Sequence, residues 1–139
     1  MIVGNHFSLK GDHEKAALFF KRATVVDPQN MNAWLLLGHE LIELRNPSAA
    51  FAAYQQAAQC PNASRDMRPW YAMGQLFELI NQMAFAVFYH NKAIQVQPKD
   101  PRIWKALAGC YLKLNRADES QYCNGKVKTL SSDPAAMAM

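Results

Sequence analysis

Three tryptophans, Trp34, Trp70 and Trp104, divide the sequence at nearly regular intervals. Three more columns keep the same register along the chain: Gly4, Gly38 and Gly74; Ala16, Ala50 and Ala86; Ala23, Ala57 and Ala93. The agreement of four columns predicts a repeat of about 34 residues, with two extra residues between the second and third repeats. A chain of this kind folds by stacking small units on one another.

Each repeat carries the pattern of two helices joined by a break. In the second repeat, Trp34, Leu37 and Leu41 recur at helical spacing before a break at Asn46-Pro47, where proline suits a first helical position. A second helix follows, with small and aromatic residues on one face: Ala50, Tyr54 and Ala57. The later repeats break near Asn81 and at Asn115-Arg116. Since no segment alternates as a β-strand does, we expect an all-α solenoid, a right-handed stack of about seven to eight helices in antiparallel pairs.

Composition narrows the class of protein but says nothing of activity. Of the 139 residues, 50% are apolar and 19% are charged, which is typical of a globular, soluble, intracellular chain. No apolar stretch reaches the roughly 18 residues that a membrane span needs. The net charge of +4 is too small and too scattered to predict nucleic-acid binding. Three cysteines, an odd number, exclude a full disulfide framework.

The order Trp-x2-Leu-Gly, then Ala-x3-aromatic, then Pro resembles the tetratricopeptide repeat. The resemblance implies a tetratricopeptide-repeat superhelix over residues 1–130 and a flexible tail over 131–139. The expected repeats are about 1–30, 31–66, 67–100 and 101–130. The first lacks the start of its first helix, so we expect an internal fragment of a longer protein. His90 replaces an aromatic residue, and the last repeat is degraded like a wettable end cap, with Ser120, Asn124 and Val127 in place of Ala, aromatic and Ala.

Residues at positions that the general repeat pattern does not specify resemble one particular family. Together, four segments resemble the C-terminal repeats of the eighth-subunit (cell-division-cycle protein 23) family of the anaphase-promoting complex: Gly4–Ala23, Trp34–Ala57, Trp70–Ala93 and Asp100–Tyr122. The loop at 60–67 departs from that family. The resemblance implies a scaffold in a ubiquitin ligase of mitosis and the cell cycle, in nucleus and cytoplasm. It also implies that other protein subunits or peptides are the partners and that the ligase chemistry lies elsewhere. It leaves open a homodimer of the full-length protein.

No motif predicts catalysis, a cofactor or a metal site. His13-Glu14 begins like a zinc-protease motif but lacks the second histidine one turn later. His6, His39 and His90 have no cysteine or histidine at ligand spacing, and we expect His90 to be a packed helix residue. Cys110 and Cys123 are expected to be small buried thiols. The sequence therefore predicts a binding protein and not an enzyme.

Solenoids of this kind bind partners on the concave face, which the first helix of each repeat builds. Positions one turn apart on those helices offer amides, an aromatic ring and both charge signs, a row suited to an extended peptide or a partner helix. These residues are Asn5, Asn32, Leu35, His39, Glu43, Arg68, Tyr71, Gln75, Glu78, Arg102 and Lys105.

The alternative function is a peptide-binding co-chaperone-type adaptor, whose clamp holds a terminal carboxylate with basic and amide side chains. Asn5 fits one clamp position, and Arg68 or Arg102 fits another. However, Leu36 stands where an asparagine is needed, and alanines at 72 and 106 occupy a basic position. A carboxylate with so few donors loses more to desolvation than it gains. The sequence therefore does not predict a working clamp.

Overall fold

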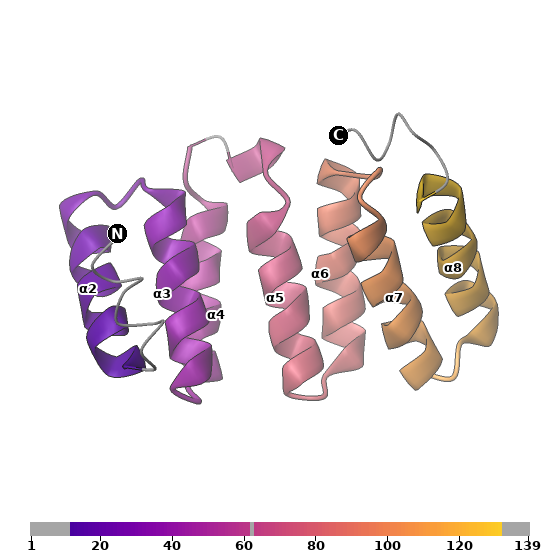
Figure 1. Ribbon diagram of the computed structural model, residues 1–139, viewed down its shortest axis with the longest axis horizontal. Coiled ribbons are helices and arrows are strands. Elements are labelled where there is room, and N and C mark those ends of the chain that lie inside the picture. Colours follow the sequence, from indigo (N-terminus) through magenta and orange to yellow (C-terminus); the bar gives the residue numbers. More distant parts are fainter. Residues whose placement is uncertain (1–11, 62, 132–139) are drawn as a thin grey trace. The chain divides into compact units, whose positions relative to one another are not determined.

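The computed structural model describes residues 12–61 and 63–131 as helices joined by short turns (Figure 1). The described residues contain seven α-helices and one 3-10 helix, which confirms the all-α class. The chain divides into an N-terminal unit, Met1–Arg65, and a C-terminal unit, Asp66–Met139. The N-terminal unit holds α2 (His13–Val26), α3 (Met31–Glu43), α4 (Pro47–Ala58) and η1 (Ala63–Arg65). The C-terminal unit holds α5 (Arg68–Leu79), α6 (Met83–Val96), α7 (Pro101–Lys113) and α8 (Ala117–Ser131).

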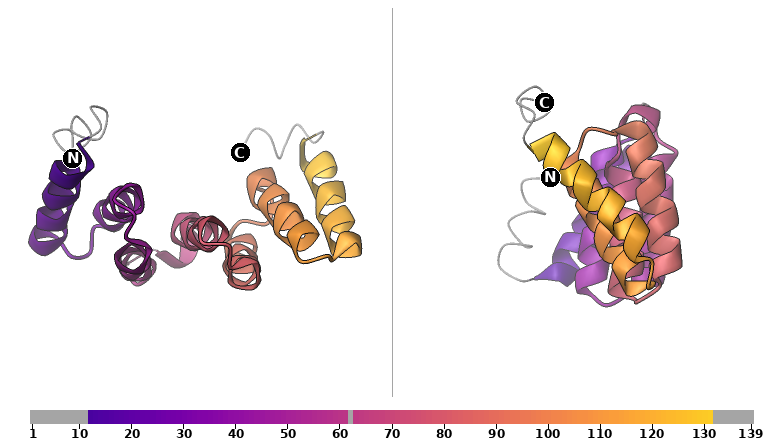
Figure 2. Two further views of the ribbon diagram at one scale, coloured as in Figure 1. Left: turned by 90° about the horizontal axis from the view of Figure 1, so that it is seen from below. Right: turned by 90° about the vertical axis from the view of Figure 1, so that its right-hand side faces the viewer.

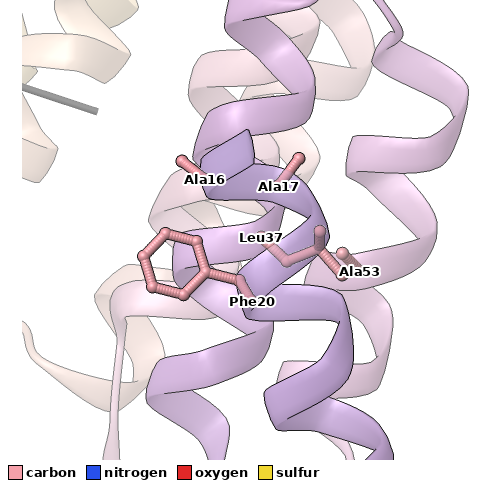
Figure 3. Packing of buried hydrophobic residues seen from close by; sticks show 5 residues of the cluster. All are labelled: Ala16, Ala17, Phe20, Leu37 and Ala53. Carbon is pink, nitrogen blue, oxygen red and sulfur yellow. The ribbon is translucent and has the colours of Figure 1, made fainter. Parts of the chain in front are cut away.

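Helices α3 and α4 of the N-terminal unit start at asparagine caps. Asn30 and Asn46 accept hydrogen bonds from the backbone N–H groups of Ala33 and Ala49, and Pro47 is the first residue of α4. Helices α2, α3 and α4 each pack on the next. The core between them, shown in Figure 3, combines small residues with one large ring: Ala16, Ala17, Phe20, Leu37 and Ala53. The break expected at Asn46-Pro47 is thus confirmed.

The C-terminal unit repeats this arrangement over two helix pairs. Each of its helices packs on the next, and Figure 2 shows α7 and α8 side by side. Asp100 caps α7 by accepting from the backbone N–H of Arg102. Three clusters join the helices, one around Ala93 and Ile103, one around Ala86 and Cys110, and one around Leu107 and Cys123.

The turns inside the helix pairs share one unusual backbone conformation. Arg45, Asn81 and Asn115 have φ angles of 59°, 61° and 60°, in the left-handed region. The three positions recur with the spacing of the repeat columns. Asparagine tolerates this region better than most residues do. The three helix pairs that the structure describes in full, α3–α4, α5–α6 and α7–α8, therefore turn at the same register position, where the sequence predicted a break.

Two glycines let an aromatic ring of the second helix approach the backbone of the first. A Cβ atom on Gly38 would collide with the ring of Tyr54. On Gly74 it would lie 2.5 Å from Nδ1 of His90. In the last repeat Ala108 takes the glycine's place, and its carbonyl accepts a hydrogen bond of 2.9 Å from the Ser120 hydroxyl. The expectation that small residues stand where helices cross is confirmed.

The prolines at the ends of two repeats, Pro28 and Pro98, each accept a hydrogen bond from a tryptophan of the next repeat. The Trp34 indole N–H donates to the carbonyl of Pro28 at 2.8 Å, and Trp104 donates to Pro98 at the same distance. Each proline thus ends one repeat and offers its carbonyl to the tryptophan that opens the next.

The last repeat differs in part from the end cap expected from its sequence. Ser120 was expected on a wettable face, but it is 5% exposed, because its hydroxyl is satisfied inside the helix pair by Ala108. Asn124, by contrast, is exposed. The first helix of the first repeat and the tail after Ser131 lie outside the described residues. The handedness of the whole stack spans both units and stays a prediction.

Candidate protein-binding face

Helix α3 presents most of its predicted residues to solvent. Asn32, His39 and Glu43 are exposed, but Leu35 is 5% exposed, so its assignment to an outward row is wrong. At about 100° per residue, Asn32, His39 and Glu43 lie within about 20° of one line along the helix, and Leu35 lies about 60° away. A leucine at the edge of the stripe turns into the core. Asn5 lies outside the described residues.

His39 is held in place by the second helix of its pair. Its Nδ1 lies 2.7 Å from the Tyr54 hydroxyl, which donates to it when the imidazole is neutral. Although the residue reaches solvent, its ring packs edge-on against the ring of Tyr54. This partial burial lowers the pKa of His39, and the charge of Glu40 opposes that effect in part. The stripe therefore offers partners an amide, a neutral imidazole and a carboxylate.

In the C-terminal unit, both predicted arginines are already paired. Arg68 forms a bidentate salt bridge with Asp66, and Arg102 forms one with Asp100. The closest N–O distance is 2.7 Å in each pair. The hydrogen bonds from each guanidinium lower the pKa of its aspartate. The two Asp-x-Arg pairs stand one repeat apart, so they belong to the repeat. Exposed pairs of this kind add little stability, but they fix where the guanidinium lies.

Tyr71 sits between this charged edge and the interior. It is half-buried, and its ring lies 5.4 Å from the ring of His90, centroid to centroid. Burial raises the pKa of Tyr71, while the positive charge of Arg102 and a hydrogen bond with the Gln75 side chain act against it. Both Gln75 and Lys105 are exposed. Tyr71 of α5 thus lies near its neighbour Gln75 and near Arg102 at the start of α7.

Glu78 turns inward and joins residues that the sequence did not connect with it. One carboxylate oxygen lies 3.1 Å from Nε2 of His90, and the other accepts from the Cys110 thiol at 3.4 Å. Burial opposes ionisation, but the hydrogen bonds from His90 and Cys110, together with the charges of His90 and Lys113, outweigh it and hold the pKa of Glu78 below its usual value. His90 is fully buried, which confirms it as a packed residue. No spacing rule predicts this trio, because each residue comes from a different helix.

The other singled-out histidine also has a carboxylate partner. Nδ1 of His13 lies 2.6 Å from Oε2 of Glu40, whose side chain is 7% exposed. The pair joins the start of α2 to the last turn of α3. The structure therefore gives the residue of the incomplete protease-like motif a packing role.

The clamp positions of the alternative function are not shaped for a carboxylate. Ala72 is buried, and Leu36 packs against the core of the N-terminal unit. The two arginines offered for the clamp carry their own aspartates. A terminal carboxylate would have to compete with those aspartates for its donors.

Comparison with known proteins agrees with the repeat predicted over residues 31–66. The model of the family described as "Tetratricopeptide repeat" matches residues 32–59, which span α3 and α4. The chain contains tetratricopeptide repeats. Among the described residues, no helix is both long enough and apolar enough to cross a membrane.

Curated relatives match parts of the chain. Anaphase-promoting complex subunit 8 of Arabidopsis thaliana is 48% identical over 34% of this chain, and subunit CDC23 of Saccharomyces cerevisiae is 45% identical over 35%. The cell division cycle protein 27 homolog of Caenorhabditis elegans is 33% identical over 69%. The chain spans 8% to 12% of the length of these relatives. The resemblance to the eighth-subunit family is thus found in segments.

Solved structures share the fold at low sequence identity. A MamA crystal structure aligns with a TM-score of 0.83 and 20% identity, covering 95% of this chain and 71% of that one. The Cut9–Hcn1 hetero-tetramer of the anaphase-promoting complex aligns at 0.79 and 18%, covering 94% of this chain and 24% of that one. These likenesses establish the tetratricopeptide-type helical solenoid.

Proposed function

We propose that this chain is a non-catalytic protein-binding scaffold, a repeat segment of an anaphase-promoting complex subunit of the eighth-subunit type. The observation that carries the proposal is the 48% identity to subunit 8 of Arabidopsis thaliana over 48 residues, since residues beyond the generic repeat must match to reach it. In this role the chain acts in a ubiquitin ligase of the cell cycle and mitosis, in nucleus and cytoplasm, while other subunits supply the chemistry.

The binding surface in this proposal is the first-helix face of each unit. In the C-terminal unit it consists of Tyr71, Gln75, Arg102 and Lys105. Tyr71 supplies an aromatic anchor whose ring is already held against His90. Its side chain therefore loses little conformational entropy when a partner binds. In the N-terminal unit the row is Asn32, His39 and Glu43. Peptides or helices from other subunits suit such mixed rows, because amides and paired charges provide directional hydrogen bonds.

The test uses the 139-residue chain and purified budding-yeast anaphase-promoting complex assembled without its subunit CDC23, with binding measured by biolayer interferometry. Lys105→Glu on α7 should weaken binding at least about fivefold, because a rim charge sets association. Lys128→Glu on α8 makes the same charge change on an exposed second-helix position and should leave binding unchanged. If the parent chain does not bind, the proposal is contradicted. If only Lys128→Glu loses binding, the interface lies on the second-helix face.

The co-chaperone alternative is tested in parallel with an acidic peptide that ends in a free carboxylate. We expect no saturable binding, since Arg68 and Arg102 are engaged by Asp66 and Asp100. Saturable binding that is lost in Arg102→Ala would favour the alternative.

A further inference from the structure

We propose that Glu78, His90 and Cys110 form a binding site for a zinc-class divalent cation inside the C-terminal unit. They come from α5, α6 and α7, one residue from each helix. One ligand atom from each residue lies within 4.8 Å of the other two. The site adjoins Tyr71 of the first-helix binding face, but the proposal does not depend on the proposed function.

The donor set is one that zinc accepts. Zinc binds thiolate sulfur, imidazole nitrogen and carboxylate oxygen in tetrahedral geometry, and water often completes three protein ligands. In such a site, neighbouring ligand atoms lie roughly 3.3–3.6 Å apart, given Zn–N and Zn–S bonds of about 2.0 and 2.3 Å. Oε2 of Glu78 lies 3.1 Å from Nε2 of His90, and Oε1 lies 3.4 Å from the sulfur of Cys110. Because one ligand atom from each residue lies within 4.8 Å of the other two, side-chain shifts of about 1–1.5 Å bring the three donors to zinc-site spacing.

Access is provided on one side only. His90 and Cys110 are 0% exposed, whereas the Glu78 side chain is 30% exposed. A cation and its remaining water can enter past the carboxylate, while the two softer donors lie behind it. Tyr71 covers the ring of His90 at a centroid distance of 5.4 Å.

The nitrogen of His90 that faces the cluster is Nε2, which lies 3.1 Å from the Glu78 carboxylate. Nδ1 is buried against Gly74 and finds no partner among the described residues, so Nε2 is the atom that would bind the ion. A histidine nitrogen lone pair is among the strongest zinc donors that proteins offer.

The charges of the ligands also suit a divalent cation. When the ion binds, the Cys110 thiol releases its proton to solvent, and the resulting thiolate and the Glu78 carboxylate are two negative ligands. These two negative charges balance the charge of the ion, so the buried group as a whole is neutral.

The experiment titrates zinc chloride into the reduced, chelator-treated 139-residue chain and follows heat by calorimetry. We expect one zinc per chain, with release of one proton that is seen as a dependence of the heat on the buffer. Glu78→Gln, His90→Tyr and Cys110→Ser should each weaken binding by about tenfold or more. His90→Tyr restores the ring type that Tyr54 provides at the same register position, so it is compatible with the fold.

Matched controls separate this site from incidental binding. Cys60→Ser and Cys123→Ser change the other two buried cysteines, and His13→Asn changes the other histidine that is paired with a glutamate. All three should keep the parent affinity. Equal weakening by these controls, or unchanged affinity in Glu78→Gln and Cys110→Ser, would overturn the proposal.

A measurement on the unmodified chain covers the case in which a variant fails to fold. Cobalt(II) should give a thiolate-to-metal charge-transfer band and intense tetrahedral visible bands that saturate at one equivalent. Zinc should then remove them. A chain that gives no thiolate band with cobalt and no heat with zinc has no such site.

Discussion

The imidazole of His90 lies against Gly74 so closely that a Cβ atom at Gly74 would be 2.5 Å from the ring's Nδ1 and Cε1. Gly74→Ala should therefore lower the free energy of unfolding by about 1–3 kcal/mol, because the buried ring has to move. Chemical denaturation of both proteins measures the difference. Gly109→Ala is the matched control, since Gly109 lies in α7 with nothing within 4 Å of its Cβ position. It should gain about 0.5–1 kcal/mol through helix propensity.

The same contact predicts coupling between the two residues. In a His90→Ala background, Gly74→Ala should cost far less, because the ring that opposes the new methyl group is gone. Equal cost in both backgrounds would show that the helix backbones, and not the ring, require the glycine.

Arg45 occupies a conformation that asparagine adopts in the other two helix pairs. Its φ of 59° matches those of Asn81 and Asn115, and its side chain is exposed. Arg45→Asn should therefore stabilise the chain by about 0.5–1 kcal/mol, because asparagine is less strained in the left-handed region. Asn115→Arg, the reverse change at the equivalent turn, should destabilise it. Thermal melting of both variants measures the effect, and changes of the same sign in both would contradict this account.

His13 and Glu40 have apolar counterparts elsewhere in the chain. At the same register positions two repeats later, Met83 and Cys110 pack in one cluster, and Leu76 is the counterpart of Glu40 in the third repeat. His13→Met alone should cost about 1–3 kcal/mol, because it leaves the carboxylate of Glu40 buried without its partner; the partial exposure of His13, 29%, reduces the loss.

The double variant His13→Met/Glu40→Leu should recover most of the stability lost in His13→Met, since an apolar pair of similar volume replaces the hydrogen-bonded pair. Denaturant midpoints of the parent, both single variants and the double variant complete the cycle. If the double variant is as unstable as the sum of the single variants, the two side chains are not coupled.

The repeat columns were sufficient to predict the helices, their breaks and the small residues at the helix crossings, because these follow from period, proline position and residue size. They were not sufficient for Glu78, His90 and Cys110. Those residues lie on three helices, and their meeting depends on how the Glu78 side chain turns. Leu35 was misplaced for a related reason: it lies at the edge of the exposed stripe of α3, where periodicity alone does not decide between core and solvent.

His39 should make the chain sensitive to mild acid. Burial lowers its folded-state pKa below the ordinary value of 6.5, against the weaker opposing charge of Glu40, and its Nδ1 accepts from the Tyr54 hydroxyl only when unprotonated. As the pH falls through 6.5, the unfolded chain binds a proton here before the folded chain does. The stability from this group is therefore complete above that pH and is lost progressively below it. Glu78, whose pKa is lowered from 4.5, acts in a separate, more acidic window.

The matched variant is His39→Gln, which keeps a hydrogen-bond acceptor for Tyr54 but does not titrate. Denaturant midpoints of both proteins, measured from about pH 7.5 to about pH 5, should diverge as the pH falls, and the parent should lose more stability, because only the parent carries this histidine. Effects of pH that are common to both proteins cancel in the difference. A difference that stays constant over this range would mean that His39 has the same proton affinity in the folded and unfolded chains. The opposite slope would mean that the folded state favours the imidazolium, so that Glu40 outweighs burial.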